Sequence, residues 1–446
     1  MANTRKSRST DLAERIEGEI TPLLPPHSSI LVGLSGGVDS VVLLHLLQNL
    51  SLRTSWQLSA LHVHHGISPN ADQWSDFCAE LCTLLRIPLS IEHVDIAPLR
   101  SHGIEAAARK LRHEALAKQQ CDFVALAHHA DDQAETMLLQ LLRGSGVRGA
   151  SAMTQLSKYD AGPSMVRPLL HCSRQEIIAY AAEHQLKWIE DESNADEFYP
   201  RNFLRHRIMP VLEEKFPAYR STMSRSAAHF AEASMLLDEL AEQDALQAIA
   251  EGTLAVSALR KLSHQRGKNL LRFFLKTKGV QMPRTLRLDD MLHQLCVARD
   301  DAAVCISCGG YDVRRYLDRV FVHTSLGDFD RNTVLEWRGE STLDWPALNA
   351  RLRFIKTCGQ GISLEKLQRE PVSFRMRQGG ESLRPEVRAS ARSLKNLLQE
   401  HHIPPWQRAR LPLLYSGDEL VWVAGVATEA DYQALEHETG VLVSCE

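Results

Sequence analysis

Residues 29–40 read SILVGLSGGVDS, and this stretch decides the fold class of the N-terminal part of the chain. Its first half is a short apolar run, typical of a buried β-strand, and its second half contains two glycines suited to a tight turn. Val38 and the leucine-rich residues after it predict a helix directly behind the turn. A strand that enters a helix through a glycine turn indicates the first unit of a parallel β-α-β sheet.

The same alternation of strand and helix patterns continues over the next hundred residues. Further strands are expected at 57–63, 88–94 and 122–127, and helices at 38–50, 70–86, 104–118 and 131–142. We therefore predict an α/β fold with a parallel sheet and helices on both of its faces. Polar clusters follow three of the strands, at residues 35–40, 62–66 (HVHHG) and 128–136 (HHADDQAET). Ligands bind beyond the carboxyl ends of strands in such sheets, so all three clusters are expected at one ligand-binding edge.

Residues 35–40, Ser-Gly-Gly-Val-Asp-Ser, have the properties of a phosphate-binding loop. The glycines let backbone N–H groups approach an anion, and the helix N-terminus that follows favours negative charge. Ser35 and Ser40 add hydroxyl donors, whereas Asp39 would repel a bare phosphate and so implies a cation, most simply Mg²⁺. The spacing matches neither a Walker P-loop nor a dinucleotide-binding fingerprint. A generic glycine turn before a helix is the alternative interpretation.

Asp131, Asp132 and Glu135 form an acidic cluster after the fourth predicted strand. If the helix starts near residue 130, Asp131 and Glu135 lie on one face. Such carboxylates would hold Mg²⁺ on a triphosphate, or hold an incoming amine and accept its proton. The alternative is that acidic residues in a first turn only complement the helix dipole.

The hexapeptide at 35–40 resembles the PP-loop of the N-type ATP pyrophosphatases, and the chain as a whole resembles the tRNA(Ile)-lysidine synthetase family. The narrower resemblance is carried by motifs that occur in order along nearly the whole chain. They are EAAARKLR at 105–112, HHADDQAETMLLQLLRGSGVRGASAM at 128–153, RPLL at 167–170, WIEDESN at 188–194, RNFLRH at 201–206, FRMRQGGE at 374–381, SLKNLL at 393–398 and IPPWQR at 403–408.

The resemblance implies an ATP-dependent carbon–nitrogen ligase that modifies a tRNA(Ile) with a CAU anticodon. ATP would adenylate O2 of the wobble cytidine and release pyrophosphate, and the ε-amine of L-lysine would then attack C2 and displace AMP. ATP is expected on Ser35, Gly36, Gly37, Val38, Asp39 and Ser40, with Mg²⁺ on Asp39 and Asp132. The catalytic candidates are Asp39, Asp131, Asp132 and Glu135. Substrate or tRNA contacts are expected from Arg109, Arg112, Arg201, Asn202, Arg205, Arg375, Arg377, Lys395 and Arg408.

The length of 446 residues suggests about three domains. We expect a PP-loop domain at 1–215, a mostly helical tRNA-binding domain at 216–325 and a small α/β tRNA-binding domain at 334–446, with a linker at 326–333. One long helix is expected at 225–249 and another helix near 389–401. No apolar run approaches the roughly 18 residues of a membrane span, and the N-terminus does not resemble a secretory signal. The expected compartment is therefore the cytoplasm.

The net charge of −4 excludes a uniformly basic nucleic-acid coat but not local basic surfaces. Residues 199–225 contain six basic and two acidic side chains, and residues 365–411 contain ten basic and five acidic ones. Both segments suit a phosphate backbone, although ion-paired surfaces look the same in a sequence. Trp406 has two equal interpretations, as a packing anchor or as a base-stacking platform. The oligomeric state, monomer or homodimer, stays open.

The cysteines bear on the alternative functions. Cys305 and Cys308 form the only C-x-x-C, in a segment that predicts a strand and a turn. A tRNA thiolase, the rival within the same superfamily, would need reactive cysteines near the loop or an iron–sulfur cluster. Cys78, Cys82 and Cys121 lack the expected spacing. The rival from another class is a catalytically silent tRNA-binding protein, against which the intact loop argues.

Overall fold

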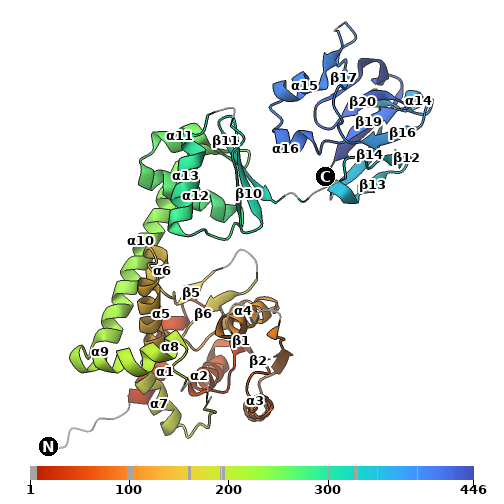
Figure 1. Cartoon of the computed structure of the whole chain (residues 1–446). Coiled ribbons are helices and arrows are strands. Elements are labelled where there is room, and N and C mark those ends of the chain that lie inside the picture. The colour runs from red at the N-terminus through yellow and green to blue at the C-terminus, as the bar shows by residue number, and fades with distance from the viewer. Residues whose placement is uncertain are drawn as a thin grey trace, which may run out of the picture. The chain divides into compact units, whose positions relative to one another are not determined.

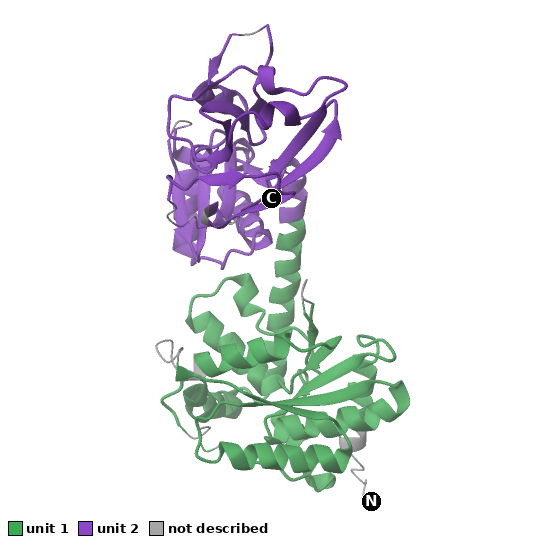
Figure 2. Cartoon of the chain, turned by 90° about the vertical axis from the view of Figure 1, so that its right-hand side faces the viewer, with its two compact units in different colours: residues 1–240 green, residues 241–446 purple. Residues whose placement is uncertain are grey.

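The computed structural model describes residues 8–97, 104–158, 162–190, 192, 196–299, 302–325, 327, 330–348, 350–388 and 390–445. The chain forms two compact units, residues 1–240 and 241–446 (Figure 2). No helix in these described ranges is both long enough and apolar enough to cross a membrane. The predicted domain limits, 1–215, 216–325 and 334–446, remain predictions.

The first unit is built on the predicted parallel sheet. Its first elements are α1 (Arg8–Ile20), β1 (Ser29–Gly33), α2 (Val38–Thr54), β2 (Gln57–His64), α3 (Ala71–Leu85), β3 (Leu89–His93), α4 (Ile104–Ala117), β4 (Phe123–Ala125) and α5 (Ala130–Leu142). The strand order is β3-β2-β1-β4-β6-β5, in which β6 (Ser164–Val166) continues the parallel pairing and β5 (Leu156–Ser157) is antiparallel. The α/β fold with a parallel core is therefore confirmed.

The two faces of the sheet bury different side chains, because successive residues of a strand point to opposite sides. Ile30 and Val32 of β1 belong to the core that contains α2 and part of α3, whereas Leu31 packs with Leu116 of α4. Figure 1 shows α2 and α3 on one face of the sheet and α4 on the other. This arrangement leaves the carboxyl ends of the strands for the polar loops.

Further helices lie before and after the last two strands of the sheet in the sequence. They comprise α6 (Val147–Ala150), α7 (Arg174–Glu183), α8 (Pro200–Phe203), the π-helical segment η3 (Leu204–Ile208), α9 (Met209–Lys215) and α10 (Tyr219–Ala248). The long helix that we predicted from residue 225 begins six residues earlier, at Tyr219. Apolar side chains of α5, η3 and α9 form a small core that contains Ala134, Leu204 and Met209. The RNFLRH segment is thereby packed against the acidic helix α5.

The first half of the second unit is mostly helical, with an antiparallel sheet attached. It contains α11 (Val256–Lys261), α12 (His264–Thr277) and α13 (Thr285–Val297), together with β7 (Ile249–Ala250), β8 (Thr253–Ala255), β9 (Cys305–Cys308), β10 (Tyr311–Tyr316) and β11 (Arg319–Thr324). The sheet order is β7-β8-β11-β10-β9, of which only the segment around Cys305 was predicted as a strand. Of the two C-x-x-C cysteines, Cys305 is exposed and Cys308 is half-buried.

The C-terminal half of the second unit is β-rich. Its strands are β12 (Leu335–Trp337), β13 (Thr342–Trp345), β14 (Ala350–Cys358), β15 (Ile362–Ser363), β16 (Val372–Arg375), β17 (Ser382–Leu383), β18 (Arg392–Ser393), β19 (Leu413–Ser416), β20 (Glu419–Val423), β21 (Ala427–Thr428) and β22 (Thr439–Cys445). Its helices are α14 (Leu364–Leu367), α15 (Leu394–Glu400) and α16 (Pro405–Arg408), with short 3₁₀ turns at Pro346–Leu348 and Ala430–Tyr432.

The helix expected near 389–401 begins later than predicted, at Leu394. Ser393 ends the short strand β18, and its side chain accepts a hydrogen bond from Asn396 N, so it caps the new helix. Ala389, with which the predicted helix began, lies outside the described residues, as do Leu326, Asp328 and Phe329 of the predicted linker.

Candidate functional site

The loop between β1 and α2 has a backbone that only glycine adopts easily. Gly36 has φ +87°, and a Cβ atom there would lie 2.8 Å from Cδ1 of Ile189. The carbonyl oxygen of Gly36 also accepts a hydrogen bond from Ile189 N at 2.9 Å. The WIEDESN segment therefore supports the loop from outside. Val38 begins α2 and is buried.

Two hydroxyls hold the loop closed. Ser40 Oγ donates to Gly37 O at 2.9 Å and accepts from Ser35 N at 3.2 Å, and the Ser35 and Ser40 hydroxyl oxygens are 3.2 Å apart. Among the described residues, no side chain caps the N-terminus of α2 at Gly37. The first N–H groups of the helix thus remain available to an anion, as expected for a phosphate site.

A buried histidine that we did not predict as a site residue fixes the start of this loop. His62 is 5% exposed, and its Nδ1 lies 2.9 Å from Leu34 O. Burial lowers the pKa of His62, which favours a neutral ring that donates from Nδ1 to the carbonyl. The HVHHG motif was predicted to lie at the ligand-binding edge. A strand pattern does not say, however, which of its histidines points inward.

The acidic turn meets the loop through His129. His129 is the N-cap of α5, and its backbone N donates to Asp132 Oδ2 at 3.1 Å. Its ring is 1% exposed, with Nε2 at 3.7 Å from Asp39 Oδ1 and 3.4 Å from Asp132 Oδ2, and with Nδ1 at 3.6 Å from Asp131 Oδ2. Although burial opposes it, the charges of Asp132, Asp131 and Asp39 raise the pKa of His129. A histidine ring whose charged form is favoured therefore lies among three carboxylates.

Asp39 has an acceptor atom that fits a cation. In the described part of the chain, no hydrogen-bond donor reaches its buried Oδ1 atom. Burial, with the like charge of Asp132, raises the pKa of Asp39, so a bound cation would stabilise its ionised form. No cluster of three or more His, Cys, Asp or Glu side chains in the described ranges is arranged to hold a metal. This donor set suits Mg²⁺, which usually takes one or two carboxylates and completes its shell with phosphate oxygens and water.

Two predicted arginines pair with two predicted carboxylates. Arg201 donates to Glu135 Oε2 at 2.7 Å and to Asp132 Oδ1 at 3.0 Å. Arg205 donates to Glu135 Oε1 at 2.7 Å and to Asp132 Oδ1 at 3.3 Å. Glu135 is 1% exposed, and although burial opposes it, the charges of His129 and Arg201 lower the pKa of Asp132. All four oxygens of Asp132 and Glu135 accept hydrogen bonds. The roles expected of these two carboxylates at a metal or an amine remain predictions.

Asp131 is held by an arginine that we had counted only as part of a basic segment. Its Oδ1 accepts from Arg220 Nε and its Oδ2 from Arg174 N at 2.9 Å. Although burial opposes it, the nearby His129 ring and these two hydrogen bonds lower the pKa of Asp131. Arg220 lies in the first turn of α10, and a sequence pattern gives no sign of its partner, because the two residues are 89 positions apart.

The arginines of α4 lie close to two neutral histidines. Arg109 and Arg112 are exposed. Burial and the charge of Arg112 lower the pKa of His65 to about 4. Burial also lowers the pKa of His128 to about 3, with Arg109 among the charges that contribute. Both histidines follow strands at the carboxyl edge of the sheet, so the arginines add positive charge to the edge that carries the loop.

Asn202 has a structural partner, because its Nδ2 donates to Asp196 O at 2.9 Å. Asp191, Ser193 and Asn194 of the WIEDESN motif lie outside the described residues.

The candidates of the C-terminal module lie apart in sequence from this edge. Arg375 donates to Gly417 O at 2.7 Å, and Arg377 lies 3.5 Å from Glu381. Lys395 is exposed on α15. Of these three, Lys395 presents its side chain most openly to a partner.

Arg408 and Trp406 take part in packing within the second unit. Arg408 donates to Tyr316 OH at 2.9 Å, and the Trp406 ring packs edge-on against Phe321 at 5.5 Å. The guanidinium of Arg314 lies 5.3 Å from the Trp406 ring centroid. Of the two interpretations of Trp406, these contacts favour the packing anchor.

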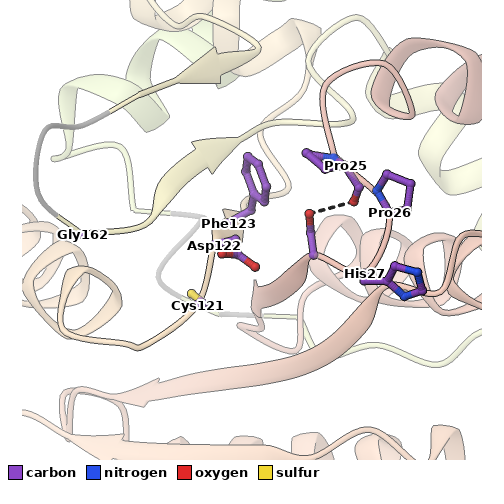
Figure 3. Close-up of a pocket in the computed structure, with 8 residues that line it drawn as sticks. Pro25, Pro26, His27, Cys121, Asp122, Phe123 and Gly162 are labelled. Atoms are coloured by element: carbon purple, nitrogen blue, oxygen red, sulfur yellow. Dashed lines mark hydrogen bonds between the residues drawn. The ribbon is translucent and has the colours of Figure 1, made fainter.

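A cavity of about 520 Å³ lies at the other end of the sheet (Figure 3). Its walls include Pro25, Ser28, Cys121 and Asp122, which precede β1 and β4, and Ser28 Oγ donates to Pro25 O at 2.7 Å. The phosphate-type loop follows the carboxyl end of β1, so this cavity is not the nucleotide site.

Family models and known proteins match most of the chain. Family models match as a PP-loop domain at residues 8–212, a TilS substrate binding domain at 254–321 and a TilS substrate C-terminal domain at 372–445. A tRNA(Ile)-lysidine synthase from Nitrosomonas europaea is 41% identical, with 100% of this chain and 97% of the relative covered. That of Coxiella burnetii is 36% identical, with 94% and 93% covered, and that of Salmonella typhimurium is 39% identical, with 93% and 96% covered. The chain belongs to the tRNA(Ile)-lysidine synthase family.

Proposed function

We propose that the chain is an ATP-dependent ligase that joins L-lysine to C2 of the wobble cytidine in CAU-anticodon tRNA(Ile). The observation that carries this proposal is the meeting of the Ser35–Ser40 loop with the His129, Asp132 and Glu135 cluster at one sheet edge. The family supports ATP, tRNA(Ile) and lysine as reactants. The CAU anticodon, Mg²⁺ and the cytoplasmic location are parts of the proposal.

In the first half-reaction, O2 of the cytidine attacks the α-phosphate of ATP, and pyrophosphate leaves. The loop N–H groups and the hydroxyls of Ser35 and Ser40 would bind the phosphates. Mg²⁺, when bound, supplies positive charge that offsets the charge developing on the phosphate oxygens, and Asp39 would hold it. Arg201 and Arg205 are oriented by Glu135 and Asp132 and so provide fixed positive charge for the same phosphates.

In the second half-reaction, the ε-amine of lysine attacks C2, and O2 leaves the base on the phosphate of AMP. The ammonium form must first lose a proton to a base. Asp39 is our candidate for contact with the amine or its proton, because its Oδ1 lacks a donor among the described residues. Asp131, Asp132 and Glu135 act in this proposal as positioning residues for His129 and the two arginines.

The buried cysteines argue against the thiolase alternative. Burial raises the pKa of Cys78 to about 12 and that of Cys82 to about 11, so neither is a thiolate at neutral pH. Burial also raises the pKa of Cys121, which lines the cavity at the opposite end of the sheet. Sulfur transfer needs a reactive thiolate, which these three cysteines do not supply.

The proposal is tested with purified protein, Mg·ATP and radiolabelled lysine, with and without CAU-anticodon tRNA(Ile). We expect AMP release and label on the tRNA only when that tRNA is present, and neither with Asp39→Ala. AMP release without label on the tRNA would assign another nucleophile, with sulfur tested first. The absence of both signals would indicate a silent tRNA-binding protein and refute the proposal.

A further inference from the structure

We propose that Arg220, in the first turn of α10, is a positioning residue of the ligation site and acts through Asp131. The inference rests on the proposed function and extends it to a helix outside the sheet.

The guanidinium of Arg220 is fixed on three sides. Its Nε donates to Asp131 Oδ1, while Nη1 and Nη2 donate to Glu213 Oε1 at 2.8 Å and Oε2 at 3.0 Å. Its carbon Cζ lies 4.6 Å from the centroid of the Tyr219 ring, and its side chain is 20% exposed. A bidentate carboxylate and an aromatic face together hold the plane of the guanidinium, so the Nε–H direction toward Asp131 is set.

Asp131 links Arg220 to His129 in the site. Arg220 holds one carboxylate oxygen, and the backbone N of Arg174 holds the other at 2.9 Å. That second oxygen lies 3.6 Å from His129 Nδ1, a distance at which charges attract but no hydrogen bond forms. The opposite nitrogen of His129 faces Asp39 and Asp132. The ring position therefore depends on where Asp131 is held.

Loss of Arg220 would change how Asp131 is held. Asp131, whose side chain is 16% exposed, would keep its negative charge without its guanidinium partner. Asp131 would no longer be fixed at its Oδ1 atom, so the His129 ring, whose Nδ1 lies 3.6 Å from Asp131 Oδ2, would be free to shift away from Asp39. The carboxylate that we place at the metal and the amine would then lose the buried ring whose Nε2 atom lies 3.7 Å from it. A displacement of about 1 Å at such a site lowers turnover on the order of 100-fold.

A second ion pair provides a matched control. Arg148 of α6 also bonds to α10, through Asp238, and its side chain is 48% exposed. The Arg148–Asp238 pair fastens the same helix, and among the described residues the Arg148 guanidinium bonds to Asp238 and not to His129, Asp39 or the loop. If Arg220 only fastened α10, loss of either pair would have the same effect on activity.

The experiment compares Arg220→Ala, Arg220→Lys, Glu213→Gln and Arg148→Ala in the full chain, using lysine incorporation into CAU-anticodon tRNA(Ile). For Arg220→Ala we expect kcat to fall on the order of 100-fold, with the KM for tRNA within about twofold of wild type. Arg220→Lys and Glu213→Gln should show smaller losses, and added methylguanidinium should restore part of the kcat of Arg220→Ala. Arg148→Ala should keep wild-type kcat.

The outcomes separate the two proposals. Wild-type protein without lysine incorporation would refute the proposed function itself. Active wild type with an unchanged kcat in Arg220→Ala, or with equal losses in Arg220→Ala and Arg148→Ala, would refute the positioning role alone. Thermal unfolding of all four variants is measured in parallel. If Arg220→Ala is unfolded at the assay temperature, the test rests on Arg220→Lys and Glu213→Gln. A wild-type kcat in both of these variants would refute the positioning role of Arg220.

Discussion

The Nε2 atom of His129 lies 3.7 Å from Oδ1 of Asp39, so the N-cap of α5 stands against the first turn of α2. The phosphate-type loop and the acidic turn are thus parts of one site, although some ninety residues separate them in the sequence. The contact also explains how several carboxylates can gather at this edge. Each of Asp39, Asp131 and Asp132 has the same buried histidine ring as a neighbour, and the pKa of that ring is raised.

The loop glycines make the first prediction. Gly36→Ala places a β-carbon at φ +87°, and a left-handed alanine costs roughly 1–2 kcal/mol. Gly37→Ala is the matched control, because Gly37 has φ −71° and its new Cβ would meet Ser35 Oγ at 3.5 Å. We expect Gly36→Ala to lower the free energy of unfolding in urea and Gly37→Ala to change it little. Equal destabilisation by the two substitutions would contradict the assigned backbone conformation.

The second prediction concerns the charge of Asp39. Asp39→Asn keeps the shape of the side chain but removes the charge, so we expect Mg²⁺-dependent AMP formation to fall by a factor of about 100 or more. Asp76 is exposed on α3 and provides the control, since Asp76→Asn should retain wild-type activity. The measurement is the initial rate of AMP formation by wild type and both variants across a Mg²⁺ titration. A normal Mg²⁺ dependence in Asp39→Asn would exclude Asp39 as the metal ligand.

The third prediction concerns the ion pairs of Glu135. Glu135→Gln removes one buried charge and leaves two guanidiniums without it, a change that costs about 3–5 kcal/mol in comparable sites. Glu365→Gln breaks an exposed pair with Arg369 on the protein surface and should cost about 0.5 kcal/mol or less. Urea unfolding at neutral pH measures both. A loss for Glu135→Gln no larger than that for Glu365→Gln would show that the network adds no stability.

The pKa of His65 makes the fourth prediction, on pH dependence. Its pKa falls from 6.5 in the unfolded chain to about 4 in the folded one, so between these values the unfolded state binds more protons. The free energy of unfolding should therefore decrease as the pH falls through this window. Between pH 7.5 and pH 5, the free energy of unfolding should fall in both proteins. We expect the fall to be about 1 kcal/mol smaller in His65→Gln than in wild type, after allowing for screening of this half-buried ring.

Urea unfolding curves of both proteins at the two pH values provide the measurement. The other histidines and carboxylates contribute equally to both proteins, so the difference isolates His65. Parallel loss of stability in wild type and His65→Gln would mean that the ring is as accessible to protons as in the unfolded chain.

The sequence alone determined the sheet, the loop and the family. Strand and helix periodicity is a local property, and a turn such as that at Gly36 needs a residue type that is visible in the chain. For this reason the predicted strands and helices of residues 29–142 all occur, with bounds that shift by a few residues. The ordered motifs likewise indicated the family, which the full-length relatives confirm.

Only the tertiary structure decided which charged groups are bound and which are open. Arg201 and Glu135 are 66 positions apart and Arg220 and Asp131 are 89 apart, so no local pattern pairs them. A basic segment reads the same whether its arginines face a phosphate or a buried carboxylate, because long-range ion pairs form only when the chain closes. The same reason applies to Trp406, which contacts Phe321 from a distant segment of the chain. The sequence could identify these residues as candidates, while folding decided that Glu135 accepts hydrogen bonds from two arginines and that no donor among the described residues reaches Asp39 Oδ1.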